Sequence, residues 1–317
     1  MLQRVGNYRI EGEIGKVNGG VLLRGTHLFL PRRAVVKVVN ETVAGLQPFA
    51  VQLLREACIL EALHHAGVPQ VYESGLLPDR RPWFAAEPVA GETLGQRIGR
   101  GPLPVNDVAM IVRDLAEVLE HAHRRGVIHR ALRPERIVLT AERRHFALSV
   151  VDWSEARTHD AGGNIPHVPT PGSRAYVAPE LVRGDALDDR ADVYALGVIA
   201  YQALTGHLPR EINAALAPHV PALERRPEAP RELAQLVDQM LSIDRFDRPA
   251  SAEVRADLDF LTHVLAHAPV QEVLELVDST GVGYGPRIRK PRWTPAVVAV
   301  RPEELPVVPP GARPSKN

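Results

Sequence analysis

This sequence has very little cysteine and contains no long run of apolar residues. Its single cysteine, Cys58, cannot form a disulfide within the chain, which argues against a disulfide-stapled secreted domain and favours a reducing compartment. A transmembrane helix needs about 20 consecutive apolar residues. The nearest candidate, residues 193–204, is shorter and contains Tyr201 and Gln202. The N-terminus opens no apolar run either, so we expect no membrane span and no signal peptide, and we predict a cytoplasmic protein.

Net charge and lysine are also scarce. The chain carries 38 Lys and Arg residues against 38 Asp and Glu residues, so its composition predicts neither a nucleic acid nor an anionic membrane as a default partner. The lysines are few and lie at positions 16, 37, 290 and 316. A lysine kept in such an arginine-rich chain suggests a position where a compact ammonium suits better than a planar guanidinium.

Residues 129–136 are the most informative segment of the chain. They read His-Arg-Ala-Leu-Arg-Pro-Glu-Arg, which resembles the catalytic loop of protein kinases, H-R-D-L-x-x-x-N. In that family the Asp is the catalytic base and the Asn holds a second magnesium ion. Here Ala131 takes the place of the Asp, and Arg136 takes the place of the Asn. The segment therefore resembles the loop of a pseudokinase, a kinase-like protein without the catalytic groups.

Seven other segments resemble kinase motifs and follow the order of the family. In the N-terminal part, residues 14–20 match the glycine-rich loop, residues 34–37 match the V-A-I-K strand, and residues 54–57 match the αC helix. Further along, residues 151–154 match the D-F-G segment and residues 172–180 match the A-P-E segment. Residues 192–197 match helix F, and residues 244–249 match the D-x-x-x-R-P segment. The pattern is most similar to bacterial serine/threonine kinases of eukaryotic type. The resemblance implies an α+β, bilobal protein-kinase-like fold. Its parts would be a small β-rich lobe at 1–88, a larger helical lobe at 89–266, and a proline-rich tail at 267–317 that is extended or docked.

Several matching residues have architectural roles in the family. The resemblance implies a buried ion pair between Glu180 and Arg248. It also implies that Asp192 accepts hydrogen bonds from backbone N–H groups of the catalytic loop. A spine of stacked side chains that connects the two lobes would consist of Leu60, Val71, His129 and Trp153. These residues predict a kinase shape and say nothing of activity.

The departures from the family concentrate on residues that perform chemistry. Ala131 has no proton acceptor, and general-base catalysis is worth roughly 10²–10⁴-fold. Arg136 cannot ligate a metal ion, because a guanidinium offers only donors. Val17 replaces the second glycine of the phosphate loop, where a β-branched side chain obstructs the approach of a phosphate. Val35 and Ser154 replace the adenine-pocket alanine and the D-F-G glycine. We therefore predict no catalytic residues and no enzyme activity.

Nucleotide binding is a separate question, because residues that grip phosphates in the family are present. The candidate nucleotide-binding residues are Gly15, Gly20, Lys37, Glu56, Glu87, Val89, Arg136 and Asp152. Arg136 either replaces magnesium and neutralises a phosphate, or it pairs with Asp152 and fills the empty site. Lys37 either faces a nucleotide or only pairs with Glu56. We expect no required cofactor and no metal site, and ATP binding, without magnesium, stays an open alternative.

The sequence thus predicts a catalytically inactive scaffold or allosteric regulator that acts through protein binding. Its expected partner is an active kinase, a phosphatase or another enzyme. Alternatives are an ATP-binding sensor, and an enzyme that uses the cleft for an atypical transfer such as nucleotidyl transfer. Candidate phosphoacceptors are Thr158, Thr170 and Ser173, and in the family Arg130 meets a phosphorylated residue of this segment. In the tail, Trp293 beside a basic cluster is a candidate for docking on the kinase body or on a partner.

Overall fold

The computed structural model describes residues 2–17, 19–40, 47–140, 146–158, 173–185, 188–210 and 217–267. All of them lie in the first of two units of the chain, Met1–Gly281. The predicted tail beyond His267, with Trp293, lies outside the described residues, as does the candidate phosphoacceptor Thr170.

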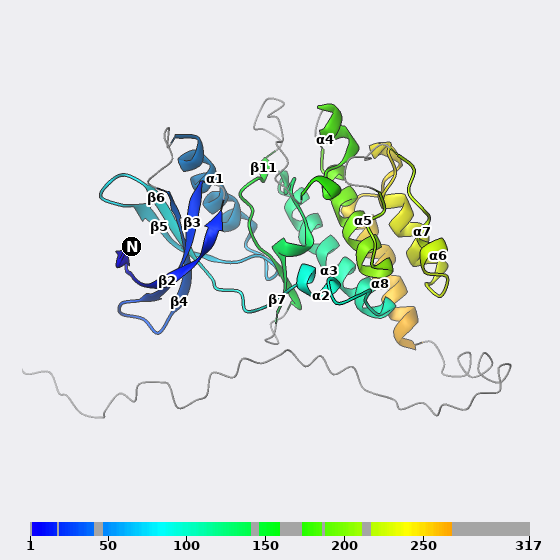
Figure 1. The fold of residues 1–317 in the computed structure, drawn as a ribbon, viewed down its shortest axis with the longest axis horizontal. Helices are drawn as coiled ribbons and strands as arrows, with labels where there is room; N and C mark the ends of the chain where they lie inside the picture. Colours follow the sequence, from blue (N-terminus) through cyan, green and yellow to red (C-terminus); the bar gives the residue numbers. More distant parts are fainter. Residues whose placement is uncertain are drawn as a thin grey trace, which may run out of the picture. The chain divides into compact units, whose positions relative to one another are not determined.

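The N-terminal lobe is an antiparallel sheet with one long helix. Its strands are β1 (Arg4–Val5), β2 (Tyr8–Val17), β3 (Gly20–His27), β4 (Arg33–Val39), β5 (Val71–Leu76) and β6 (Pro82–Ala86). They form a six-stranded sheet in the order β1-β2-β3-β4-β6-β5, with every neighbouring pair antiparallel. Helix α1 (Gln47–Leu63) packs against β4, β5 and β6, and Figure 1 shows it alongside the sheet.

Strand β6 is fully buried because it lies between β4 and β5 and carries apolar groups on both faces. Neighbouring residues of a strand point to opposite faces of the sheet. Trp83 packs with Tyr8 and Val36 in one apolar cluster. Phe84 packs on the other face in the cluster that includes Leu53 of α1. The sheet is therefore held by its own apolar cluster on one side and by the helix on the other.

The C-terminal lobe is mostly helical and is built around α5 (Arg190–Thr205). Helices α3 (Val105–His123) and α7 (Arg231–Met240) pack against α5, and α8 (Ser251–His267) packs along α3. Helix α5 is buried on nearly every side, which explains why its sequence is apolar all round. Within the part of the chain that the structure describes, no helix is long and apolar enough to cross a membrane.

Short elements complete this lobe and carry the loops of the cleft. They are α2 (Leu94–Ile98), α4 (Pro179–Arg183), α6 (Ala222–Arg225), the 3-10 turns η1 (Pro134–Arg136), η2 (Arg174–Tyr176) and η3 (Arg245–Asp247), and the strands β7 (Gly91–Thr93), β8 (Val127–Ile128), β9 (Ile137–Thr140), β10 (Leu148–Val150) and β11 (Arg157–Thr158). Strands β7, β9 and β10 form one sheet, and β8 pairs with β11. The segment 129–136 thus lies between β8 and β9, which belong to two different sheets. The arrangement confirms the predicted α+β, bilobal fold.

Two buried carboxylates hold the C-terminal lobe together as predicted. Arg248 Nη1 and Nη2 donate to Glu180 Oε1 and Oε2 at 2.7 and 2.8 Å, and both side chains are at most 1% exposed. The carboxylate of Asp192 accepts from the backbone N–H groups of His129 and Arg130, each at 2.7 Å. The first contact ties α4 to the segment before α8, and the second ties the catalytic loop to α5.

Two members of the predicted spine, His129 and Trp153, are in direct contact. The rings of His129 and Trp153 lie with their centroids 4.6 Å apart. Trp153 Nε1 donates to the Val150 carbonyl at 2.9 Å, which supplies the partner that a buried indole needs. Leu60 is buried and Val71 is partly buried in the same apolar cluster as Trp153. Burial lowers the pKa of His129 to about 4, so its ring is neutral at neutral pH.

Candidate functional site

The catalytic-loop segment has the backbone of a kinase loop without a base. Arg130 adopts a left-handed conformation, with φ of 69°, and its N–H is held by Asp192. This sharp turn points the next residue, Ala131, into the interior, where it is 6% exposed. The Ala131 N–H donates to His129 Nδ1 at 3.3 Å. A methyl group therefore stands where the resemblance implies a carboxylate.

The side chain of Arg136 extends from η1 into the centre of the cleft. Its Nη1 donates to the carbonyl of Ala131 at 3.0 Å. Its Nη2 lies 2.9 Å from Asp152 Oδ2 and 3.2 Å from Glu155 Oε1. Only 6% of the residue is exposed. This geometry matches the second interpretation of Arg136, in which the guanidinium pairs with Asp152.

A second ion pair continues from the same aspartate. Lys37 Nζ lies 2.6 Å from Glu56 Oε2 and 3.7 Å from Asp152 Oδ1. Burial alone would raise the pKa of Asp152, but the cations of Arg136 and Lys37 lower it to about 2. Burial raises the pKa of Glu56, against the attraction of Lys37. Alternating charges thus cross the cleft in a line that we call the cleft ion chain: Glu56, Lys37, Asp152, Arg136 and Glu155.

Glu155 is a member of the cleft ion chain that sequence reasoning missed. It follows the D-F-G-like segment and matches none of the motifs, although an acidic residue so close to Asp152 is a signal that could have drawn attention. Its carboxylate is the second anion on Arg136. Across the described residues, no group of three His, Cys, Asp or Glu side chains is arranged to hold a metal ion.

The glycine-rich hairpin between β2 and β3 lies close to α1. Gly15 faces Leu22 across the β2–β3 ladder. A Cβ atom on Gly20 would lie 2.7 Å from the carbonyl oxygen of Val38, so glycine is required there. Gly19 has a φ of +69°, and a Cβ atom on it would lie 1.9 Å from Cδ1 of Phe49. The hairpin tip is therefore in direct contact with the Phe49 ring of α1, a contact that the sequence did not predict.

Little space remains beneath the hairpin tip. The cavity bordered by Gly20, Lys37, Phe49 and Ser154 has a volume of about 10 Å³, which holds about one water molecule. Gln52 Nε2 donates to the Ser154 carbonyl at 3.0 Å and ties α1 to the D-F-G-like segment. This is the region where the resemblance places the phosphates of a nucleotide.

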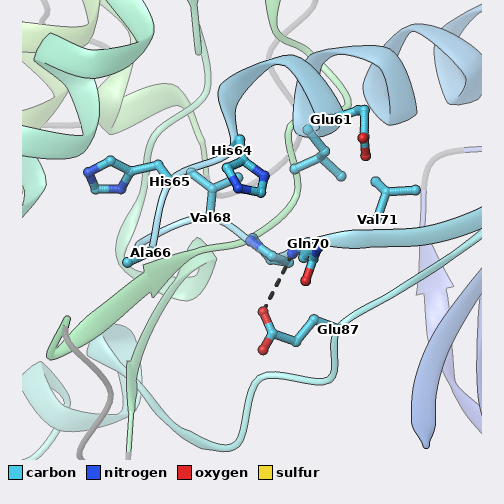
Figure 2. A pocket seen from close by; sticks show the side chains of 10 residues that line it. Glu61, His64, His65, Ala66, Val68, Gln70, Val71 and Glu87 are labelled. Atoms are coloured by element: carbon cyan, nitrogen blue, oxygen red, sulfur yellow. Dashed lines mark hydrogen bonds between the residues drawn. The ribbon is translucent and has the colours of Figure 1, made fainter.

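The connection between β6 and β7 contains Glu87 and Val89. The Glu87 N–H donates to the Gln70 carbonyl at 2.9 Å, and its carboxylate accepts from the Gln70 N–H at 3.4 Å. Figure 2 shows the Glu87 side chain pointing toward Gln70. A hollow of about 300 Å³ lies here, and Glu61 and His64 from the end of α1 also line it. Both the N–H group and the carboxylate of Glu87 are therefore bonded to Gln70.

The activation segment places one candidate phosphoacceptor in solvent and one inside. Arg157, in β11, lies near Arg55 and Arg130, and burial followed by repulsion from these two cations lowers its pKa to about 10. Thr158, the next residue, is exposed. Ser173 is only 5% exposed.

Comparison with known proteins agrees with this geometry. The protein kinase domain family matches residues 8–260, which is most of the chain. The chain belongs to the protein kinase family. The lobes, the Asp192 and Glu180 contacts and the spine described above are therefore those of a kinase domain.

Several bacterial serine/threonine-protein kinases are similar to this chain. Serine/threonine-protein kinase pkn3 of Myxococcus xanthus is 35% identical over 262 residues, which cover 78% of this chain and 48% of pkn3. Serine/threonine-protein kinase PknL of Mycobacterium tuberculosis is 31% identical over 211 residues, which cover 66% of this chain and 52% of PknL. The chain thus spans about half the length of these relatives. The crystal structure of a cysteine-to-alanine mutant of the M. tuberculosis PknI kinase domain matches with a TM-score of 0.62 and 25% identity, covering 83% of this chain and 98% of that chain.

The kinase fold brings the predicted nucleotide-site residues into three places. Four of the charged residues belong to the cleft ion chain and are in direct contact: Lys37, Glu56, Arg136 and Asp152. The two glycines lie on the β2–β3 hairpin. Glu87, in the connection after β6, lines the hollow shown in Figure 2, and Val89 lies two residues further along the same connection.

Proposed function

We propose that this chain is a pseudokinase whose cleft is closed by its own charged side chains. One observation carries the proposal: the Arg136 guanidinium is buried between Asp152 and the Ala131 carbonyl. In an active kinase this space holds a metal ion and the base. Here a cation occupies it, and a second cation would be repelled.

Phosphoryl transfer would lack two contributions in such a cleft. Ala131 offers no acceptor for the proton of a substrate hydroxyl, which removes roughly 10²–10⁴-fold in rate. A magnesium ion would have to displace Arg136 to reach the carboxylate of Asp152. The two losses act on the same step, so we expect no measurable phosphoryl transfer.

We propose that the protein acts by binding another protein, as a scaffold or an allosteric regulator. The support is the contrast between the intact kinase architecture and the altered cleft: the anchors at Glu180 and Asp192 preserve the shape that a partner would recognise. An active kinase, a phosphatase or another enzyme is the expected partner, and the cytoplasmic location stays a prediction.

The second candidate is a sensor that binds ATP without magnesium. The observation in its favour is the Lys37–Glu56 pair at 2.6 Å, the arrangement that grips phosphates in kinases. Binding would require Arg136 to exchange Asp152 for a phosphate and the hairpin to leave Phe49. The closed site is favoured because both changes have to occur together.

The test is transfer of label from ATP by the wild type and by the double variant Ala131→Asp, Arg136→Asn, with a generic acceptor protein. ATP labelled at the γ-phosphate reports kinase activity, and ATP labelled at the α-phosphate reports nucleotidyl transfer. We expect no transfer of either label by the wild type and γ-label transfer by the double variant. Wild-type γ-label transfer at a rate that the double variant cannot improve would contradict the proposal.

A further inference from the structure

The turn between β3 and β4 exposes three consecutive large apolar side chains. Leu28, Phe29 and Leu30 are 40%, 81% and 47% exposed. The turn belongs to the sheet of the N-terminal lobe, away from the helices α3 to α8 (Figure 1). Single exposed apolar residues are ordinary on a protein surface, whereas a contiguous group commonly marks an interaction site. We call these three residues the apolar tip.

The backbone of the apolar tip is held in place by hydrogen bonds. His27 Nδ1 accepts from the N–H groups of Phe29 and Leu30 at 3.2 and 3.1 Å. The His27 N–H donates to the Arg32 carbonyl at 2.8 Å and closes the turn. The apolar side chains therefore project from a fixed turn and need no ordering before they contact another surface, which favours binding.

A row of arginines runs across the sheet beside the apolar tip. Arg4 is paired with Arg9, Arg9 with Thr26, and Thr26 with Arg33. Directly paired residues of antiparallel strands lie on the same face of a sheet. All three arginines are exposed. Since Thr26 and Arg33 lie just before and just after the turn, the positive charges and the apolar side chains lie at one end of the lobe.

The acidic residues near this row are already engaged. Glu11 Oε1 accepts from Thr26 Oγ1 at 2.6 Å, and Glu73 Oε1 accepts from Asn7 Nδ2 at 3.2 Å. Arg32 adds a further cation, stacked 4.5 Å from the centre of the Tyr72 ring. Both carboxylates keep their negative charge, because their partners are neutral, but the four cations Arg4, Arg9, Arg32 and Arg33 outnumber them. This end of the lobe therefore carries an excess of positive charge, which the balanced charge of the whole chain conceals.

We propose that the apolar tip and the arginine row dock this lobe on an anionic lipid surface. Phe29 and Leu30 would enter the boundary between headgroups and acyl chains, and the arginines would contact the anionic headgroups. A second copy of the chain fits less well. Two such surfaces would bring arginines against arginines, and three side chains bury far less than the roughly 800 Å² per partner of a stable complex.

The experiment is co-sedimentation of the full chain with vesicles of phosphatidylcholine, alone or mixed with phosphatidylserine. We expect binding to the mixed vesicles only, and weaker binding as salt is raised. The double variant Phe29→Ser, Leu30→Ser should bind at least about tenfold more weakly, because it loses the inserted side chains. The double variant Arg9→Gln, Arg33→Gln should lose about fivefold for each arginine.

The matched control is Phe246→Ser. Phe246 is 74% exposed and also has an arginine, Arg245, 4.9 Å from its ring, but it belongs to the C-terminal lobe. This variant should bind vesicles like the wild type. The proposal is overturned if the wild type sediments with neither vesicle, or if Phe246→Ser weakens binding as much as the tip variant. It is equally overturned if sedimentation equilibrium shows that the tip only joins two copies of the chain.

Discussion

Two sets of buried ion pairs in this molecule have opposite consequences. In the C-terminal lobe, Glu180 and Arg248 form one closed pair whose members are almost completely inaccessible to solvent. In the cleft, five residues form a longer chain, and Asp152 at its centre keeps 26% of its side chain exposed. The first pair joins two segments of one lobe. The second joins α1, β4, the catalytic loop and the activation segment around a space where an active kinase binds its ligand.

The difference shows how a kinase domain can keep its shape while its cleft changes. In the Glu180–Arg248 pair, each charged group has the other as its ion-pair partner. Each member of the cleft ion chain except the two ends has two oppositely charged neighbours. If a substitution removes one of these neighbours, the other still compensates part of the buried charge. We therefore expect the largest effects on stability in the lobe and the largest effects on ligand binding in the cleft.

The largest expected effect comes from Arg248→Ala. It leaves the carboxylate of Glu180 buried without a cation, which should lower the free energy of unfolding by about 3–5 kcal/mol. Urea unfolding followed by circular dichroism measures this. The control is Arg183→Ala, because the Arg183–Asp185 pair at 2.8 Å is 42% and 50% exposed and should contribute less than about 1 kcal/mol. Equal effects of the two variants would contradict the comparison.

Arg136→Asn should convert the cleft into one that takes up magnesium and ATP. Removing the guanidinium frees Asp152 for a metal ion, and ligand at 100 times its Kd stabilises by about 2.7 kcal/mol. Thermal unfolding with ATP, with and without magnesium, measures the gain, and Arg133→Asn in the same loop is the control. ATP could instead stabilise the wild type without magnesium, and Arg136→Asn could abolish that stabilisation. This result would support the proposal of an ATP sensor and contradict the proposal of a closed cleft.

Asp152→Asn should produce a stability difference that depends on pH. The pKa of Asp152 in the folded protein, about 2, lies below the ordinary value of 3.8. Its charged form therefore stabilises the fold above about pH 4, by about 2 kcal/mol, and this contribution disappears as the pH falls toward 2. The raised pKa of Glu56 acts in the opposite direction, and because the charge of Asp152 contributes to that rise, Asp152→Asn removes part of it.

Urea unfolding of the wild type and of Asp152→Asn, from pH 7 down to pH 2, measures this difference. We expect a constant gap above about pH 5 that narrows below it. A gap that stays constant down to pH 2 would show that the loss of packing, and not of charge, separates the two proteins.

Phe49→Ala should have the smallest effect on stability and a specific effect on the hairpin. Phe49 is only partly buried, so we expect a loss of about 1–2 kcal/mol. Removing the ring enlarges the small cavity under Gly19. Combined with Arg136→Asn, it should tighten ATP binding further, which titration calorimetry measures. Val51→Ala, at a position 51% exposed on the same helix, is the control and should leave affinity unchanged.

The sequence predicted the contacts that depend on residue type and motif order. Glu180, Arg248 and Asp192 were assigned partners because the family places them in fixed positions, and the structure confirms those partners. Arg136 is different: a guanidinium at a metal position has two physically reasonable partners. The structure shows the contact with Asp152, at 2.9 Å, and the contact with a phosphate stays a prediction.

Contacts that depend on three-dimensional proximity could not be predicted. Phe49 covers Gly19 because a glycine with a positive φ leaves room for a ring from another element, and no motif records that approach. The apolar tip was missed for a related reason. A sum of charges over the whole chain is zero even when one end of a lobe is basic.

The hydrogen bonds of Asp192 also determine how the catalytic loop moves. Loops of this kind usually exchange their amide hydrogens quickly, because they open without disturbing the core. Here the amides of His129 and Arg130 are bonded to a carboxylate that is 1% exposed on α5, the most buried of the long helices. These two amides should exchange as slowly as those in the middle of α5. The loop that has lost its base would then be among the most rigid parts of the protein.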